Sequence, residues 1–266
     1  KPKLLLFILS FFSIKHLLSP FILKSVNNPT KQIIDYQAFS GDDSCIRYFL
    51  SNVRKGADAM NVITVMSDEH SYHMMQFVSH SILKTPNLDR LAAESTVFDN
   101  CYSPCPVCAP ARSSFIAGRF VNRLGTWDNS TPYDGRVPGL SHYLTQHGKR
   151  YVSIGKTHFH PEGEYGFTHQ EYPGYMTRPD IGCFFRDQKT GRIGAEKRFE
   201  KIGLKSEESH DDRVLNASLN WLREHGYEEN WLLYIGFLDP HFPFYVKEEN
   251  WNYFEKKITE IPDVLE

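Results

Sequence analysis

The chain has 266 residues, of which 41% are hydrophobic and 23% charged, and its formal net charge at pH 7 is −2. This size and apolar share suit one large α/β domain or two small ones with a sizeable core. The small net charge, with both signs interspersed, argues against a nucleic-acid partner and against a charged membrane surface. Five cysteines, an odd number, make a disulfide scaffold a poor explanation and leave the cellular compartment open.

Residues 1–59 differ in pattern from the rest of the chain. A basic start and an apolar run that ends at Ile14 resemble the first two regions of a signal peptide, but no small-x-small cleavage site follows. Lys15 interrupts the run short of the roughly 20 residues that a membrane span needs, so we expect no stable span. Because Met60 directly precedes the first strand pattern, we predict that 1–59 is a leader or a mis-called upstream extension outside the fold.

The folded domain is accordingly predicted to cover residues 60–266. The localisation depends on the start of translation. A start at Met60 predicts a cytoplasmic protein, whereas a signal peptide in residues 1–24 predicts a periplasmic or secreted one.

The first predicted strand covers residues 61–66, a short β-branched run typical of a strand buried on both faces of a parallel sheet. It leads to Asp68 and Glu69. Carboxylates just past such a strand lie where open α/β sheets bind their ligands. Taken alone, a turn with solvated acids explains this pair better.

A capped helix is predicted over residues 85–94, with Thr85 as N-cap and Pro86 in the first turn. A strand from Val97 to Tyr102 should follow and lead to the next helix.

The segment from Cys105 to Arg119 predicts a second helix. Pro110 suits its first turn and Gly118 the position just past its end. Cys108 then lies at the helix N-terminus, where free backbone N–H groups and the helix dipole favour an anion, with Arg112 one turn along on the same side. The competing interpretation is a free thiol at a helix cap, with Cys105 and Cys108 as half of a zinc site.

A short helix over 140–146 and a buried strand over 151–155 come next, and the strand leads to Lys156 and His158. A cation and a titratable imidazole on one loop suit the binding and turnover of a small anion. A solvated lysine with a loop histidine is the alternative.

Residues 160–206 have weak periodicity and predict an excursion over the site. An amphipathic helix over 211–225 follows, with Asp211 or Asp212 as its cap and Leu215, Leu219 and Leu222 on one face. The fourth strand, over 231–237, leads to His241. Because the carboxyl ends of parallel strands meet at one edge of a sheet, these polar groups should converge on one site.

The pattern of Cys108, Pro110 and Arg112, closed by Gly118 and Arg119, resembles the C-x-P-x-R signature of the type I, formylglycine-dependent sulfatase family in the alkaline phosphatase superfamily. The match extends from Met60 to about Phe244 and leans toward the choline-sulfatase-like and arylsulfatase branch. The resemblance implies an α/β fold in which a mostly parallel sheet is sandwiched between helices, incomplete at the C-terminus.

The resemblance also implies chemistry. Cys108 would be converted to formylglycine by a formylglycine-generating or an anaerobic sulfatase-maturing enzyme, and its hydrate would attack a small-molecule or carbohydrate sulfate ester. By the same resemblance, Arg112, Lys156, His158 and His241 are catalytic, and Asp68, Glu69 and residue 108 bind Ca²⁺ or Mg²⁺.

Two alternatives stay open. The same anion cradle would accept a phosphonate or phosphate monoester, because both present a tetrahedral anion. The family also needs a later Asp-His or Asp-Asn metal pair and a further lysine, and no matching segment precedes Glu266. We therefore also consider an inactive fragment that binds sulfated glycans or nothing.

Overall fold

The computed structural model describes residues 3–11, 21–26, 60–71, 74–78, 82–98, 101–174, 203–204, 208–242 and 244–257. Seven strands form its main sheet: β1 (Lys3–Phe11), β2 (Phe21–Val26), β3 (Met60–Asp68), β4 (Thr96–Phe98), β5 (Arg150–Gly155), β6 (His169–Glu171) and β8 (Trp231–Gly236). Their order is β4-β2-β1-β3-β8-β5-β6. The pairs β1·β3, β3·β8, β5·β8 and β5·β6 are parallel, whereas β2 runs antiparallel to both of its neighbours.

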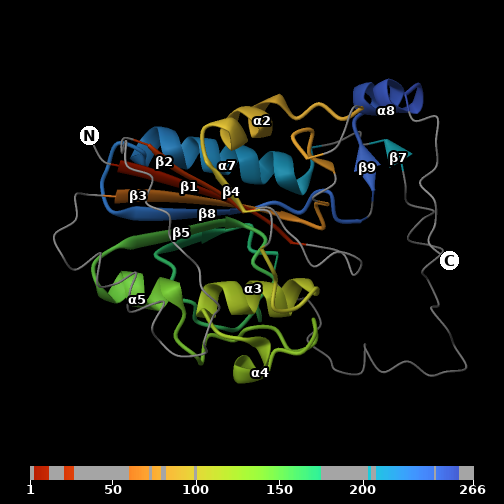
Figure 1. The fold of residues 1–266 in the computed structure, drawn as a ribbon. Helices are drawn as coiled ribbons and strands as arrows, with labels where there is room; N and C mark the ends of the chain where they lie inside the picture. Colours follow the sequence, from red (N-terminus) through yellow and green to blue (C-terminus); the bar gives the residue numbers. More distant parts are fainter. Residues whose placement is uncertain are drawn as a thin grey trace, which may run out of the picture.

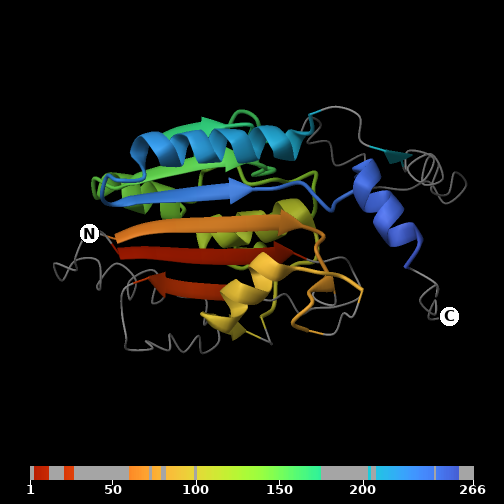
Figure 2. The same ribbon diagram turned by 90° about the horizontal axis from the view of Figure 1, so that it is seen from above.

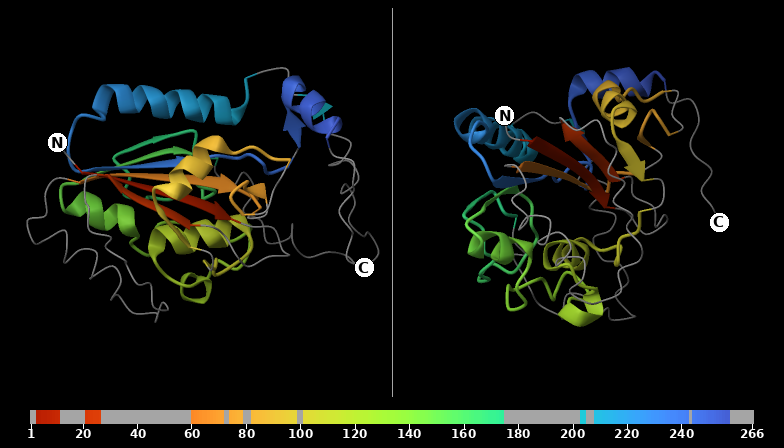
Figure 3. Two further views of the ribbon diagram at one scale, coloured as in Figure 1. Left: turned by 45° about the horizontal axis from the view of Figure 1, so that its top comes forward. Right: turned by 60° about the vertical axis from the view of Figure 1, so that its left-hand side comes forward.

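Helices cover both faces of this sheet. The helices are α2 (Pro86–Ala93), α3 (Cys108–Ala117), α4 (Val121–Leu124), α5 (Leu140–Gln146), α7 (His210–His225) and α8 (Glu248–Glu255), of which α8 lies beyond the end of the main sheet, beside β7 and β9 (Figure 1). In Figure 1, α2 and α7 lie on one face and α3 and α5 on the other, and the left view of Figure 3 shows the same layers. The predicted α/β fold, a mostly parallel sheet between helices, is confirmed.

The strands β5 and β8 are mostly apolar because both of their faces are buried; the polar exceptions in β5 are Arg150, at its start, and Ser153. Tyr151 packs with the α3 and α5 side of the core, whereas the next residue, Val152, packs with the α7 side. On β8, Tyr234 and Leu233 alternate in the same way. Successive side chains thus point to opposite faces, and both faces are buried. For this reason the two strands do not show the alternation of apolar and polar residues that is typical of a strand with one face in solvent.

The N-terminal region departs from its expectation. We expected residues 1–59 to lie outside the fold, but β1 pairs with β3 over its whole length, from Lys3 opposite Met60 to Phe11 opposite Asp68. Figure 2 shows β1 and β3 pointing the same way, with β2 reversed. A short apolar run has the same pattern in a signal peptide and in a buried strand, so periodicity could not separate the two. The domain boundary itself stays a prediction.

Two further elements differ from their predicted form. β4 has only the residues Thr96–Phe98, shorter than the strand expected from Val97 to Tyr102. Ser209, not an aspartate, caps α7: its hydroxyl accepts a hydrogen bond from the N–H of Asp212, whose side chain bonds back. Asp211 instead accepts from the backbone N–H of Leu238 and Asp239, after β8.

The buried face of α7 is also rotated from the predicted one. Val214, Ser218 and Trp221 face the sheet, whereas Leu215 is 45% exposed and Leu219 39% exposed. The side chains that face the core are thus offset by one residue from the leucine stripe that the spacing favoured.

Of the excursion expected over 160–206, residues 175–202 and 205–207 lie outside the described part. β7 (Gly203–Leu204) pairs with β9 (Tyr245–Val246) in a separate two-stranded sheet. None of the helices in the described ranges combines the length and the apolar character that crossing a bilayer takes.

Candidate functional site

Four separate segments bring polar side chains together at the carboxyl edge of the sheet. Asp68 ends β3, Lys156 and His158 follow β5, and His241 follows β8. Cys108 begins α3, which packs under this edge (Figure 1). The structure therefore brings together the groups that the sequence placed at strand ends.

The N-terminus of α3 has an unusual cap. Val107, at the N-cap position, is extended and its side chain makes no cap hydrogen bond. Asn129 replaces that cap from a distant loop: its Oδ1 accepts the Ala109 N–H at 2.9 Å, and its Nδ2 lies 3.5 Å from Cys108 Sγ. Gly118 ends the helix with a φ of 62°, as predicted for that position. The side chain of Asn129 therefore caps the N-terminus of α3 and also contacts Cys108.

A buried ion cluster lies beside this helix end. Asp68 Oδ2 bonds to Lys156 Nζ and lies 3.4 Å from an Arg112 guanidinium nitrogen. Arg112 also donates to the Lys156 carbonyl oxygen at 2.7 Å and to the Tyr234 hydroxyl at 2.5 Å. Burial alone would raise the pKa of Asp68, but the two cations lower it, so the carboxylate is ionised.

Cys108 is strongly acidic for a thiol. Burial opposes ionisation, but hydrogen bonds with His158 and His241 and the charge of Lys156 lower its pKa to about 5. The helix N-terminus adds in the same direction. At neutral pH residue 108 is therefore a thiolate, which shows that this position stabilises negative charge.

The two histidines differ in protonation. His241 donates from Nδ1 to the Phe242 carbonyl oxygen at 2.6 Å. Burial alone would lower its pKa, but its hydrogen bond to Cys108 raises it. Burial lowers the pKa of His158, and its Nδ1 has no hydrogen-bond partner among the described residues. One imidazole thus favours the charged form and the other the neutral form, which suits a pair that holds an anion and moves a proton.

Glu69 lies at the rim of the cluster with a φ of 56°. Its Oε1 is 3.9 Å from His241 Nε2. Burial raises its pKa, and the charges of Asp68 and Cys108 act in the same direction. Glu69 is not among the donors that lie within 4.8 Å of one another in this cluster, so its role as a metal ligand stays a prediction.

Two paired glycines allow the strand ends to approach. Gly155 lies opposite Gly236 at the ends of β5 and β8. A Cβ on Gly155, which has a φ of 97°, would lie 2.1 Å from the Gly236 carbonyl oxygen, and a Cβ on Gly236 would lie 2.4 Å from the Lys156 carbonyl oxygen. Side chains at either position would push away the backbone that Arg112 binds.

Three donor atoms in this cluster could hold a metal ion. A carboxylate oxygen of Asp68, Cys108 Sγ and a ring nitrogen of His241 lie within 4.8 Å of one another. From the sequence, Asp68 and Cys108 were predicted as metal ligands and His241 as a ligand of the substrate's sulfate group. That prediction missed Asn129 and Tyr234, for which the local pattern carried no signal, because their partners are remote in sequence.

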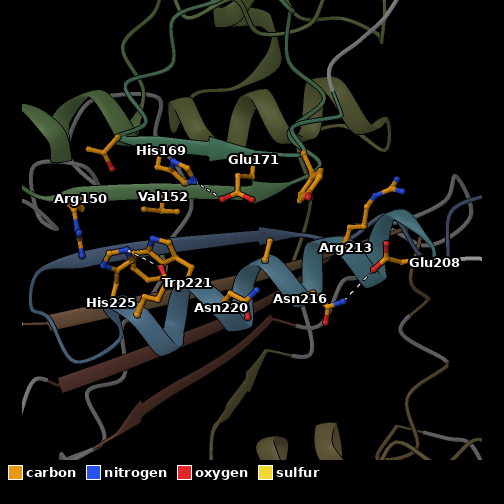
Figure 4. A pocket seen from close by; sticks show the side chains of 14 residues that line it. Arg150, Val152, His169, Glu171, Glu208, Arg213, Asn216, Asn220, Trp221 and His225 are labelled. Atoms are coloured by element: carbon orange, nitrogen blue, oxygen red, sulfur yellow. Dashed lines mark hydrogen bonds and ion pairs between the residues drawn. The ribbon is translucent and has the colours of Figure 1, made fainter.

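A separate groove of about 650 Å³ lies on the other face of the sheet, between α7 and the strands β5 and β6, of which β6 is at the edge. Figure 4 shows charged and polar side chains of both signs along it, including Arg150, Glu171, Arg213 and Glu208. Its lining, drawn from the described residues, shares no residue with the cluster around Cys108. The cluster around Cys108 thus lies outside this groove.

Comparison with known proteins places this geometry in context. The family model described as Sulfatase matches residues 60–261. The choline-sulfatase of Rhizobium meliloti is 28% identical over 214 residues, which are 73% of this chain and 41% of that protein. The N-acetylglucosamine-6-O-sulfatase of Bacteroides thetaiotaomicron is 34% identical over 109 residues, covering 41% of this chain and 19% of that protein. The chain thus spans less than half the length of these relatives.

Solved structures share the fold. A protein in complex with its substrate D-glucosamine-2-N,6-O-disulfate matches with a TM-score of 0.60 and 22% identity, over 77% of this chain and 39% of that one. The phosphonate monoester hydrolase of Agrobacterium radiobacter matches with a TM-score of 0.57 and 20% identity, over 73% and 43%. At these identities the two likenesses establish the architecture alone.

Proposed function

The chain belongs to the sulfatase family, and from that premise we propose that it hydrolyses sulfate esters at the cluster around residue 108. The single observation that carries the proposal is the meeting of Lys156, His158 and His241 around the residue that begins α3. A sulfate ester is a tetrahedral anion, and this arrangement stabilises negative charge strongly enough to ionise a thiol.

We propose Cys108 as the residue that a formylglycine-generating or anaerobic sulfatase-maturing enzyme converts. It is the only cysteine in the sequence with proline and arginine two and four positions on. The thiol is half-buried and lies at the start of α3. The hydrated aldehyde would provide the hydroxyl nucleophile of the reaction.

The donor set can be tested against the divalent cation of this proposal. Asp68 and Glu69 offer the carboxylate oxygens that Ca²⁺ or Mg²⁺ prefers, and conversion of Cys108 replaces a sulfur donor by oxygen. The converted residue therefore fits a hard cation, held by Asp68, Glu69 and residue 108. When bound, the cation would add positive charge that makes a neighbouring hydroxyl more acidic.

The chain's own residues divide the remaining work. Lys156 and His241 would face the sulfate oxygens, where the lysine charge and the imidazole N–H offset their negative charge. Arg112 is fully buried and touches Asp68, so it holds the carboxylate and adds positive potential from below. The attacking hydroxyl would lose its proton and the leaving alcohol oxygen would gain one as its bond to sulfur breaks. His158, which favours the neutral form, would then accept the proton of the second hydroxyl at residue 108, so that sulfate leaves and the aldehyde forms again.

Sulfated small molecules and sugars are the proposed substrates. Two relatives are named for choline sulfate and N-acetylglucosamine-6-sulfate chemistry, and one structural neighbour contains a disulfated glucosamine. We propose a sulfate ester of a small alcohol or an amino sugar, without choosing between them on the described residues.

The test uses the chain coexpressed with a maturing enzyme, with aldehyde at residue 108 verified by peptide mass spectrometry. We expect hydrolysis of an aryl sulfate, and then of choline sulfate or N-acetylglucosamine-6-sulfate, that is lost in Cys108→Ala and retained in the control Cys105→Ser. An aryl phosphonate monoester serves as the competing substrate. A verified aldehyde without sulfate release, or faster phosphonate cleavage, would overturn the proposal.

A further inference from the structure

The donor atoms around Cys108 fit a different kind of metal ion as long as that residue is still a cysteine. The Asp68 oxygen, the Cys108 sulfur and the His241 nitrogen lie within 4.8 Å of one another. Zinc takes thiolate and imidazole ligands readily, whereas calcium prefers an all-oxygen set. We propose that the unconverted chain binds Zn²⁺ through Asp68, Cys108 and His241.

His241 is already oriented as a metal-binding imidazole. Its Nδ1 lies 2.6 Å from the Phe242 carbonyl oxygen. A carbonyl oxygen can only accept, so Nδ1 carries a proton and Nε2 is the nitrogen that faces Cys108. Zinc binding would replace the Nε2 proton, because a histidine ligand has to be neutral. A hydrogen bond from the second ring nitrogen to a backbone carbonyl is the usual support of a zinc-bound histidine.

Cys108 offers its sulfur from a fixed position. It is the first residue of α3, and Asn129 bonds both to the adjacent backbone N–H and toward Sγ. A thiol must lose its proton to bind zinc, and a helix N-terminus favours the thiolate. The sulfur is therefore held in place before any metal arrives.

Asp68 provides the carboxylate oxygen of this donor set. Among the described residues, both of its ion pairs, with Lys156 and Arg112, use Oδ2. One carboxylate oxygen of Asp68 lies within 4.8 Å of Cys108 Sγ and of a ring nitrogen of His241, so Asp68 is the third ligand. Zinc commonly takes three protein ligands and keeps a fourth position for water or another carboxylate.

This assignment makes the metal preference of the site depend on residue 108. The cysteine provides a soft ligand that selects zinc, whereas formylglycine would provide oxygen and select a hard cation. The inference concerns the unconverted chain and does not depend on sulfate ester hydrolysis. A Cys105 and Cys108 thiolate pair is the competing zinc site, and the experiment separates the two.

The test titrates Co²⁺, a spectroscopic substitute for zinc, into the full chain expressed without a maturing enzyme and stripped of metal. We expect a thiolate-to-cobalt charge-transfer band in the near ultraviolet and intense visible bands of a tetrahedral site. One equivalent of Zn²⁺ should abolish both, and a large excess of Ca²⁺ should not. Cys108→Ser should lose the charge-transfer band and His241→Asn should bind Co²⁺ more weakly, while Cys105→Ser should match the parent.

Retention of the band in Cys108→Ser, its loss in Cys105→Ser, or displacement of Co²⁺ by Ca²⁺ would each overturn the inference. Circular dichroism checks that each variant is folded. If Cys108→Ser does not fold, the matured chain replaces it, since it too lacks the thiolate and should show no charge-transfer band. Failure of the proposed hydrolysis would appear only in the matured chain, as a verified aldehyde without turnover, so the two outcomes are distinguishable.

Discussion

Helices α3 and α7 lie on opposite faces of one sheet but are stabilised in different ways. α7 is capped by its own sequence, through Ser209 and Asp212, and buries only one side. α3 has no side-chain cap from its own N-cap residue, and eight of its ten residues are buried. Its start is held instead by Asn129, twenty residues or more away in the sequence.

The difference follows from what each helix does. The first N–H groups of a helix are free to bind an anion only if the chain does not cap them locally. α7 supports the sheet and can use all of its local capping groups. α3 carries Cys108 as its first residue and has no cap from its own sequence, so its start is held by burial and by Asn129, which accepts the Ala109 N–H.

The largest expected effect concerns the cysteine at the open end of α3. We expect Cys108 alkylation by iodoacetamide in the unconverted chain to be half-maximal at about pH 5, because His158, His241 and Lys156 stabilise the thiolate against burial. Cys101 is the internal control: burial raises its pKa, so it should react only at alkaline pH. Mass spectrometry of labelled peptides over a pH series gives both profiles, and equal profiles would contradict the contrast.

The same shift predicts how stability depends on pH. A thiol whose folded pKa lies below its unfolded value of about 9 contributes stability that is complete above pH 9 and lost as pH falls through about 5. Relative to Cys108→Ser, the unconverted chain should therefore gain stability between pH 5 and pH 9. Urea unfolding at several pH values measures it, and a difference that shrinks with rising pH would refute the assignment.

Removal of the buried guanidinium in α3 should have the next largest effect. Arg112→Met leaves Asp68 with Lys156 as its remaining buried cation and should cost about 3–5 kcal/mol of unfolding free energy. The matched control is Arg213→Met on the exposed side of α7, which should change stability by less than about 0.5 kcal/mol. Urea denaturation measures both, and similar costs would mean that the buried cluster is not stabilising.

A third pair tests which face of α7 is buried. Val214 is fully buried and Leu215 is 45% exposed. Val214→Ala should therefore cost about 2 kcal/mol, through lost burial and a cavity, although it removes fewer atoms than Leu215→Ala, which should cost well under half of that. Thermal and urea unfolding decide the order, and the reverse order would restore the leucine face that the spacing favoured.

The smallest effects compare the two helix starts directly. Ser209→Ala and Asn129→Ala each remove one cap acceptor and should each cost about 1 kcal/mol of unfolding free energy. Of these two substitutions, only Asn129→Ala should also raise the pKa of Cys108, because Asn129 bonds to the Cys108 sulfur and Ser209 does not. Alkylation of Cys108 at pH 5 should slow in Asn129→Ala and not in Ser209→Ala; an equal rate in both variants would place Asn129 outside the site.

Much of the fold could be predicted because its strongest signals are local. The strands β3, β5 and β8 are mostly apolar, as expected of strands covered on both faces, and the polar groups of the site lie at or just after their last residues. α3 lies where Pro110 and Gly118 predicted it, since backbone preferences of proline and glycine act within one turn. From the sequence alone, Cys108 was therefore placed at a helix start, and the strand-end residues at one sheet edge.

Tertiary structure decided what depends on contacts between distant residues. Asn129 became the cap of α3 and Tyr234 the partner of Arg112, neither of which any local pattern marks. The pairing of β1 with β3 was not predicted, because a short apolar run has the same pattern in a leader and in a strand. Only the tertiary structure distinguishes the two. Leu215 is exposed because a spacing of three or four residues defines a stripe, while the sheet selects which stripe is covered.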